Sequence, residues 1–170
     1  GLGWSPKGGS VFSREALAKG YKEEFLTATG VSIKRNDGSL IDKFYDRVMF
    51  PIHSVSGRVI AFGGRTLRSD YKTANIGKYV NSPETEIYDK SRSLYGIYFA
   101  KSEISRQDKC FLVEGYLDVL SMHQLGITNV VASSGTSLTV PQIRLIKKFT
   151  SNVTIMYDGD AAGIHAALRG

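Results

Sequence analysis

The sequence predicts two parts of different fold class: an α+β N-terminal part with an antiparallel sheet, followed by an α/β part with a parallel sheet. In the first part, β-rich runs flank a short polar turn, which is typical of a hairpin. In the second part, short apolar runs alternate with helical patterns. The polar stretch 102–109 separates them, so we expect one subdomain over 1–105 and another over 106–170.

Two short helices are expected near the N-terminus. Ser13 is placed to cap the first helix, because a serine hydroxyl accepts a hydrogen bond from a free amide of the first turn. The second helix should cover 22–29 and end at Gly30, because glycine tolerates the positive φ that often follows a helix.

A β-hairpin should follow these helices. The runs 47–53 and 58–62 are rich in strand-forming residues, and the polar segment 54–57 separates them. Gly57 suits the turn. The pattern therefore predicts antiparallel strands.

The second half contains three short apolar runs, at 110–113, 129–132 and 153–157. Strands that are apolar throughout and separated by helices are typical of a parallel sheet covered on both faces. Open α/β sheets bind ligands at the carboxyl ends of their strands. Polar residues that follow these runs are therefore candidates for a functional site.

Three carboxylates fall at this expected edge. Glu114 follows the first strand, and Asp158 and Asp160 follow the third, where alternation places both on one side of an extended chain. Mg²⁺ binds oxygen ligands, usually one or two carboxylates together with waters and substrate phosphate. Either motif alone is more typical of a polar turn or a helix-start acid, but their combination favours a metal site for phosphoryl transfer.

Two neighbouring features leave alternatives open. Asp118, in the first turn of the next expected helix, either neighbours a metal or complements the helix dipole. The loop 133–138 carries small and hydroxyl residues but no lysine. It either cradles a phosphate or is an ordinary strand-to-helix turn capped by Ser137 or Thr139.

Positive charge is concentrated in one segment of a chain with a net charge of +6. Between 54 and 83 the only acid is Asp70, whereas the basic residues are Arg58, Arg65, Arg68, Lys72 and Lys78, with Tyr71 and Tyr79 interleaved. Cations hold phosphates and tyrosines stack on bases, so the segment suits nucleic acid without sequence readout. The alternative is a solvated hairpin edge protected by its charges.

Other features exclude several classes of protein. Cys110 is the only cysteine, which rules out an internal disulfide and a cysteine-rich zinc site, so we expect no zinc in this chain. His53, His123 and His165 show no metal-ligand spacing with the acids. No apolar run approaches the roughly 20 residues of a membrane span. We therefore expect a cytoplasmic protein without membrane contact.

Two motifs resemble the TOPRIM domain shared by primases, type IA and type II topoisomerases and some nucleases. They are Glu-Gly-Tyr-Leu-Asp at 114–118 and Asp-Gly-Asp at 158–160. Gly-Thr-Ser in the intervening loop is also similar to bacterial DnaG-type DNA primases. Four runs upstream of these motifs resemble the polymerase core of the same family in order and spacing: 47–52, 57–65, 78–85 and 94–96. The resemblance implies that the second part is a Rossmann-like TOPRIM subdomain.

The resemblance implies synthesis of short RNA primers on single-stranded DNA from ribonucleoside triphosphates, with Mg²⁺ or Mn²⁺ as cofactor, at the bacterial replication fork. Glu114, Asp158 and Asp160 match the catalytic metal positions of the family, and Asp118 matches the last acid of its first motif. Whether Glu114 binds metal or helps to deprotonate the primer hydroxyl stays open. The positions that match the template- and nucleotide-handling stretch are Arg47, Arg65, Lys78, Tyr79 and Asn81.

Members of this family also carry a zinc-binding module, a domain that engages the replicative helicase, and a further acidic motif. We therefore expect a TOPRIM subdomain truncated at its C-terminus. Two alternatives to a primase core follow: a nucleic-acid-binding module without activity, or another TOPRIM enzyme, either a topoisomerase or a nuclease. The 9 tyrosines do not exclude a topoisomerase, but nothing outside the acidic motifs is typical of its core.

Overall fold

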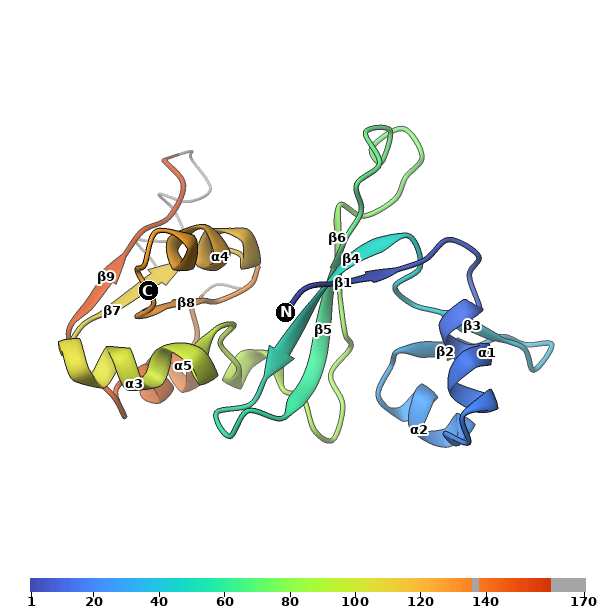
Figure 1. Cartoon of the computed structure of the whole chain (residues 1–170), viewed down its shortest axis with the longest axis horizontal. Coiled ribbons are helices and arrows are strands. Elements are labelled where there is room, and N and C mark those ends of the chain that lie inside the picture. The colour runs from blue at the N-terminus through green and yellow to red at the C-terminus, as the bar shows by residue number, and fades with distance from the viewer. Residues whose placement is uncertain (136–137, 160–170) are drawn as a thin grey trace. The chain divides into compact units, whose positions relative to one another are not determined.

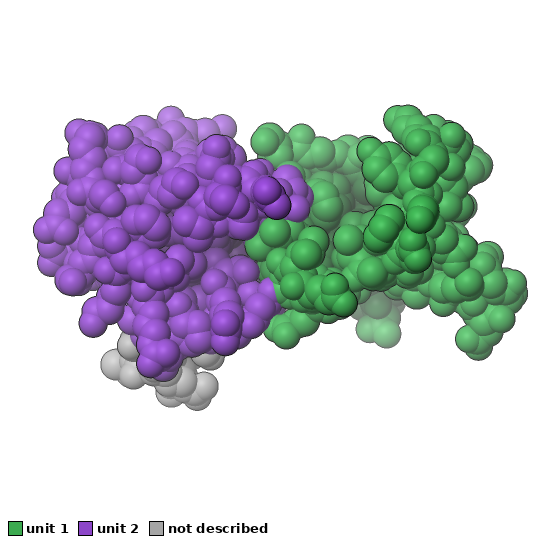
Figure 2. All heavy atoms as spheres, turned by 90° about the horizontal axis from the view of Figure 1, so that it is seen from below, with its two compact units in different colours: residues 1–51, 60–88 green, residues 52–59, 89–170 purple. Residues whose placement is uncertain are grey.

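The computed structural model describes residues 1–135 and 138–159 of the chain. They divide into two compact units, coloured separately in Figure 2: unit 1 comprises 1–51 and 60–88, and unit 2 comprises 52–59 and the residues from 89 onward. The tip of the hairpin thus belongs to unit 2, whereas most of its two strands belongs to unit 1.

An antiparallel sheet of four strands runs through unit 1 (Figure 1). The strand order is β1 (Gly3–Ser5), β4 (Arg47–His53), β5 (Val59–Arg65) and β6 (Tyr79–Asn81). β1 pairs with β4, and β6 pairs with β5. The predicted hairpin is confirmed as β4 and β5, and the residue with positive φ in its turn is Gly57.

Two helices and a small second sheet complete unit 1. They are α1 (Val11–Ala18), α2 (Glu23–Ala28) and the antiparallel pair of β2 (Ser32–Lys34) and β3 (Leu40–Asp42). The predicted second helix is confirmed, because α2 has Lys22 and Thr29 as its cap residues. Gly30 follows with positive φ, as expected.

The prediction that Ser13 caps the first helix is wrong. Ser10 is the N-cap residue of α1, and Ser13 lies inside the helix. The free amides of the first turn are bound by Asp42, whose carboxylate accepts hydrogen bonds from Phe12 N and Ser13 N, both at 2.8 Å, and from Ser13 Oγ at 2.6 Å. A carboxylate at a helix N-terminus satisfies free amides and complements the dipole. Asp42 therefore ties β3 to α1.

Unit 2 contains the predicted parallel sheet, with strand order β8-β7-β9. The strands are β7 (Cys110–Val113), β8 (Val130–Ala132) and β9 (Val153–Ile155), each inside a predicted apolar run. Parallel neighbours need crossover connections. These are α4 (Tyr116–Gln124), between β7 and β8, and α5 (Val140–Ile146), between β8 and β9.

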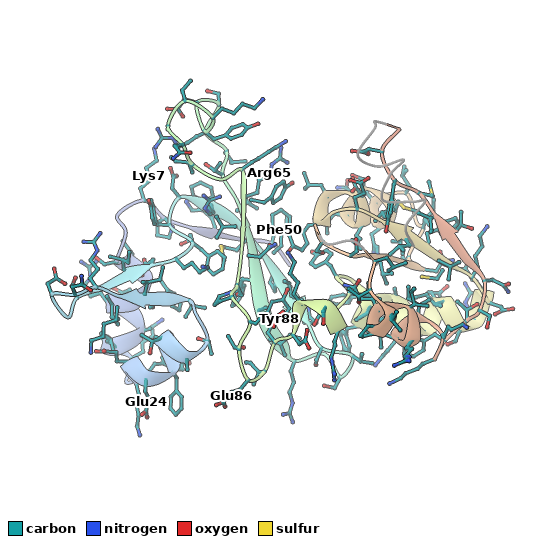
Figure 3. The ribbon with its side chains drawn as sticks, turned by 180° about the vertical axis from the view of Figure 1, so that it is seen from behind. Lys7, Glu24, Phe50, Arg65, Glu86 and Tyr88 are labelled. Atoms are coloured by element: carbon teal, nitrogen blue, oxygen red, sulfur yellow. The ribbon has the colours of Figure 1, made fainter. Side chains whose placement is uncertain are left out.

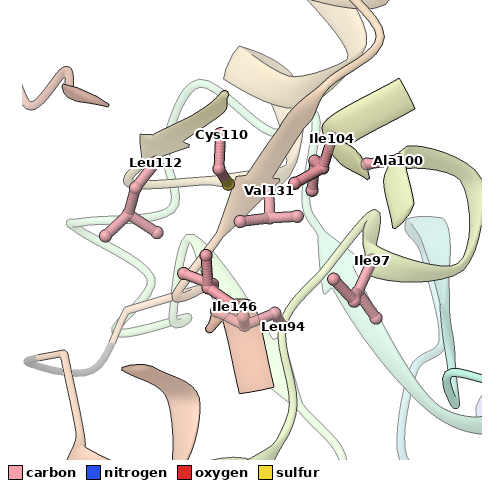
Figure 4. Packing of buried hydrophobic residues seen from close by; sticks show 8 residues of the cluster. All are labelled: Leu94, Ile97, Ala100, Ile104, Cys110, Leu112, Val131 and Ile146. Carbon is pink, nitrogen blue, oxygen red and sulfur yellow. The ribbon is translucent and has the colours of Figure 1, made fainter. Parts of the chain in front are cut away.

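Helices cover both faces of β7 and β8, as the apolar runs predicted, whereas β9 at the edge of the sheet is exposed along its length (Figure 1). One face packs against α3 (Ile97–Gln107) and α5 in the cluster of Figure 4, which consists of Leu94, Ile97, Ala100, Ile104, Cys110, Leu112, Val131 and Ile146. The other face packs against α4 through Val113, Val119, Val130 and Ala132. The two sets alternate along β7 and β8 because successive side chains point to opposite faces.

Thr139 caps α5, as expected if the preceding loop is an ordinary strand-to-helix turn. Thr139 Oγ1 accepts a hydrogen bond from Gln142 N at 3.2 Å, and Gln142 Oε1 accepts one from Thr139 N at 3.1 Å. The fully buried Gln142 also donates to Ser93 O at 2.8 Å, next to the short 3₁₀ helix η1 (Lys90–Arg92). The start of α5 is therefore fixed in unit 2 by polar contacts.

The boundary between the compact units lies at a different position from the subdomain boundary expected from the sequence. The polar stretch 102–109 lies mostly within α3, and the chain passes from unit 1 into unit 2 at residue 89. Within 102–107 the buried residue that packs on the sheet is Ile104, whereas the other residues are polar and mostly exposed, so the polar texture of this stretch marks a helix surface. None of the helices in the described part of the chain is long and apolar enough to cross a membrane.

Replacing Asp42 with alanine should destabilise unit 1 by about 2 kcal/mol, because two amides and a hydroxyl lose a buried, charged acceptor. Urea unfolding followed by circular dichroism measures this change. Asp37→Ala is the matched control, since the Asp37 carboxylate also accepts from a serine but is exposed. Equal stability of the Asp42 variant and the wild type would contradict the capping role.

Cys110 should be chemically inert in the folded chain. It is fully buried in the cluster of Figure 4, and burial raises the pKa of its thiol to about 12. At pH 8 the thiol is protonated, and only the thiolate is reactive. A chromogenic disulfide reagent should therefore modify the folded chain about 100-fold or more slowly than the denatured chain. Rapid modification without denaturant would show that this core opens readily.

Candidate functional site

The carboxyl edge of the parallel sheet brings the two acidic motifs together. Glu114 follows β7 directly, and Met156 N donates to Leu112 O at 2.8 Å, which extends the pairing of β9 with β7. Two residues later, Asp158 N donates to Glu114 Oε1 at 3.0 Å across a sequence separation of 44 residues. The edge therefore holds the Glu114 side chain against the residue that carries the second acid.

The donor atoms at this edge fit a hard divalent cation. Glu114 is half-buried and Asp158 is exposed, so both are accessible, and carboxylate oxygens are the ligands that Mg²⁺ prefers. Asp160 lies outside the described residues. Within residues 1–135 and 138–159, no three His, Cys, Asp or Glu side chains gather closely enough to hold a metal ion. The structure thus offers a pair of acids, a number that suits Mg²⁺ with water and phosphate as further ligands.

Asp118 supports the backbone beside this pair. Its Oδ2 accepts a hydrogen bond from Gly115 N at 2.8 Å, from the first turn of α4. The contact satisfies an amide at the helix start and fixes the residue that follows Glu114. Asp118 therefore holds the backbone next to Glu114. Of its two predicted roles, this contact at the start of α4 agrees with the one at the helix terminus.

The loop after β8 lies against the same edge. Ser134 N donates to Glu114 O at 3.0 Å, and both Ser133 and Ser134 are buried. Ser134 has a φ of 59°, an uncommon conformation for a residue with a side chain. Ser137, the other predicted cap, lies outside the described residues. The described part of the loop supports the backbone of Glu114.

In unit 1, the half-buried Arg65 and the exposed Tyr79 lie together in the basic segment. They are paired across β5 and β6, and the Arg65 guanidinium lies 5.7 Å from the centre of the Tyr79 ring (Arg65 is labelled in Figure 3). Asn81 is on the same face as Tyr79, because alternate residues of a strand share a face. Lys78 is exposed immediately before β6. This surface combines cations with an aromatic ring, as single-stranded nucleic acid requires.

Arg47 differs from these residues because it is buried, with 6% of its surface exposed. Its Nη1 donates to Gly64 O and to Lys78 O, both at 3.3 Å, and burial lowers the pKa of its guanidinium. A Cβ at Gly64 would lie 2.8 Å from the Phe44 ring and 3.0 Å from Arg47 Cδ, so only glycine leaves room for this arrangement. Arg47 therefore ties β4 to the backbone of β5 and the start of β6.

Part of the basic charge predicted for this segment is neutralised internally. Arg68 binds Asp70 through two hydrogen bonds, Nε to Oδ1 at 2.9 Å and Nη2 to Oδ2 at 2.7 Å. The Arg68 guanidinium lowers the pKa of the Asp70 carboxyl. Arg58, at the hairpin tip, belongs to unit 2. Within unit 1, the positive charge of the basic segment therefore depends mainly on Arg65, Lys72 and Lys78.

Two protein families match the chain, one in each half. The family described as DNA primase catalytic core, N-terminal domain, matches residues 1–101, and the Toprim-like family matches residues 111–170. The first match covers the antiparallel sheet and its basic segment, and the second covers the acidic edge.

Relatives match over almost the whole chain. DNA primase of Legionella pneumophila is 44% identical over 168 residues, which are 99% of this chain and 28% of that protein. The RNA polymerase domain of Mycobacterium tuberculosis primase DnaG is 36% identical with a TM-score of 0.89, over 99% of this chain and 56% of that structure. A DnaG primase catalytic domain bound to single-stranded DNA is 40% identical with a TM-score of 0.87, over 99% and 51%.

These matches also show that the chain spans only about a quarter of the length of the curated relatives. Its sequence, its two family matches and its fold nevertheless agree throughout. The chain belongs to the DnaG-type DNA primase family, and it corresponds to part of the catalytic core.

Proposed function

We propose that the protein carrying this chain synthesises short RNA primers on single-stranded DNA by metal-dependent nucleotidyl transfer from ribonucleoside triphosphates. The hydrogen bond from Asp158 N to Glu114 carries the proposal, because it joins the two acidic motifs at the ligand edge of the sheet. The DNA-bound DnaG primase domain, 40% identical to this chain, supports single-stranded DNA as the template.

Glu114, Asp158 and Asp160 would hold the cation, Mg²⁺ or Mn²⁺, which when bound neutralises charge on the phosphate and on the attacking and leaving oxygens. The Asp158 amide orients the Glu114 carboxylate by binding Oε1. We assign Oε2 of Glu114 to the metal or to the proton of the primer hydroxyl. Asp118 supports this geometry by holding Gly115 N.

We propose that the surface formed by Arg65, Lys78, Tyr79 and Asn81 contacts template and nucleotide. The guanidinium beside the Tyr79 ring favours this role, since phosphate and base then find a cation and a stacking surface side by side. Arg47 would act differently, by positioning the strands that carry these groups.

Functional division of the chain follows the family matches. We propose a template-handling subdomain over 1–105 and a metal-binding TOPRIM subdomain over 106–170, since one match ends at residue 101 and the other begins at 111. Contact with the replicative helicase would use a region outside this chain. We place the protein in the bacterial cytoplasm, at the replication fork.

The primase match over residues 1–101 favours this function over a topoisomerase or a nuclease, which share only the acidic motifs. A nucleic-acid-binding module without activity differs from a primase core in its response to metal. Binding by cations alone falls with salt and ignores Mg²⁺, whereas primer synthesis requires the metal.

Asp158→Asn and Glu114→Gln should each reduce primer synthesis by about 100-fold or more in a complete polymerase core, because each removes a metal-binding charge. Asp158→Asn retains the amide that binds Glu114 Oε1, so it tests the charge without disturbing the backbone. Radiolabelled primer synthesis on single-stranded DNA with Mg²⁺ measures the effect.

Fluorescence anisotropy with the same template is the parallel measurement, and both variants should bind DNA as the wild type does. Asp37→Asn, an exposed acid in unit 1, should retain full synthesis. Undiminished synthesis in both acidic variants would show that this edge is not the catalytic metal site.

Arg47→Ala and Arg65→Ala should separate folding from binding. Arg47→Ala should lower the stability of unit 1 by about 2 kcal/mol, because it leaves a cavity and two carbonyls without their donor. Arg65→Ala should leave the unfolding midpoint almost unchanged and weaken template binding about fivefold. Urea titration measures the stability of both variants, and fluorescence anisotropy measures their template binding. A stable Arg47 variant with weak binding, together with an unstable Arg65 variant, would contradict both assignments.

A further inference from the structure

Three aromatic rings gather where the hairpin tip meets α3 in unit 2. The His53 ring is stacked on the Tyr98 ring, with centroids 6.0 Å apart, and meets the Phe99 ring edge-on at 5.1 Å. Tyr98 and Phe99 also contact each other edge-on at 5.0 Å. Tyr98 is 37% exposed and Phe99 is 53% exposed, so the cluster has a face open to solvent.

The backbone around these rings holds them in place. Gly57 has a φ of 92° in the turn, and a Cβ there would lie 2.5 Å from the Tyr98 ring, so the turn packs directly on its edge. Lys101 Nζ donates to Val55 O at 2.7 Å, which ties α3 to the tip a second time. Rings fixed before binding lose little conformational entropy when a ligand stacks on them.

The surroundings of the cluster are positively charged. Lys101 Nζ lies 5.1 Å from the centre of the Tyr98 ring, and Arg58 is exposed on the tip. Neither the tip, 52–59, nor the start of α3, 97–102, contains an acidic residue. The first acid along α3 is Glu103, whose carboxylate accepts hydrogen bonds from Arg106 and Gln107. A polyanion would therefore meet attraction on this face.

We propose that His53, Tyr98 and Phe99, together with Arg58 and Lys101, form a second contact site for single-stranded nucleic acid, in which a base stacks on Phe99. Exposed rings accept any base and neighbouring cations hold the phosphates, so the site works without sequence readout. This site rests on the proposed function for its ligand, and it is separate from the Arg65 and Tyr79 surface of unit 1.

A purely structural role accounts for part of the cluster. Tyr98 contacts Gly57, His53 and Lys101, and these contacts brace the tip. Phe99 is different, because more than half of its surface is exposed although it touches both neighbouring rings. The exposed ring among cations is what favours a stacking ligand.

The test measures binding of fluorescent oligo-dT and oligo-U, each about 15 nucleotides long, to the 170-residue chain by anisotropy. Phe99→Ala should weaken binding about fivefold or more, the loss expected for one stacked base. Arg58→Ala should lower the slope of log affinity against log salt by about 0.7. A loss in the DNA arm alone identifies template as the ligand, and a loss in the RNA arm alone identifies primer.

Phe25→Ala is the matched control, since Phe25 is 59% exposed with Lys22 over its ring at 5.9 Å, but Glu23 and Glu24 flank it. It should bind both oligonucleotides as the wild type does. Thermal unfolding should show that Phe99→Ala remains folded.

A second measurement does not depend on a variant. Ultraviolet cross-linking of bromouracil-substituted oligonucleotide to the wild-type chain should label the peptide that contains Phe99. Binding that responds to Arg65→Ala but not to Phe99→Ala or Arg58→Ala, with no cross-link to this peptide, would overturn the second site alone. Absence of any oligonucleotide binding would contradict both this site and template binding by the chain.

Discussion

The parallel pairing of β7 with both β8 and β9 determines the position of every polar group at the acidic edge. Val113 pairs with Ala132, and Leu112 pairs with Ile155, so all three strands end at the same edge. Glu114, the loop containing Ser134 and the segment containing Asp158 then meet there. Apolar packing from two sides stabilises the pairing of β7 with β8, which is why a buried strand precedes Glu114.

Much of this fold is predictable because its signals are local. Apolar runs mark the parallel strands, and the turn at Gly57 marks the hairpin. The capping of α1 was not predictable in this way, because its acceptor is Asp42, 29 residues from Ser13. The division into compact units was also not visible in the sequence, because the polar residues of 102–107 belong to the exposed side of α3. Long-range contacts decide both features.

The site shows the same division between local and long-range information. The positions of Glu114 and Asp158 at this edge were predictable because each follows an apolar run, and the position of Asp118 was predictable from the first helical turn. Arg47 and Arg65 look alike in the sequence, but only Arg47 is buried. The available signal was Gly64, whose missing side chain makes room for Arg47. Its significance depends on packing with Phe44, which no local pattern contains.

The central claim is that Glu114 and Asp158 belong to one divalent-metal site at the edge of the parallel sheet. Nuclear magnetic resonance of the isotope-labelled chain during titration with Mn²⁺ tests it most directly, because bound Mn²⁺ broadens the signals of nearby amides. The amide signals of Gly115 and Asp158 should broaden first, and excess Mg²⁺ or the Glu114→Gln substitution should restore them. First broadening elsewhere, or an unchanged effect in Glu114→Gln, would contradict the claim.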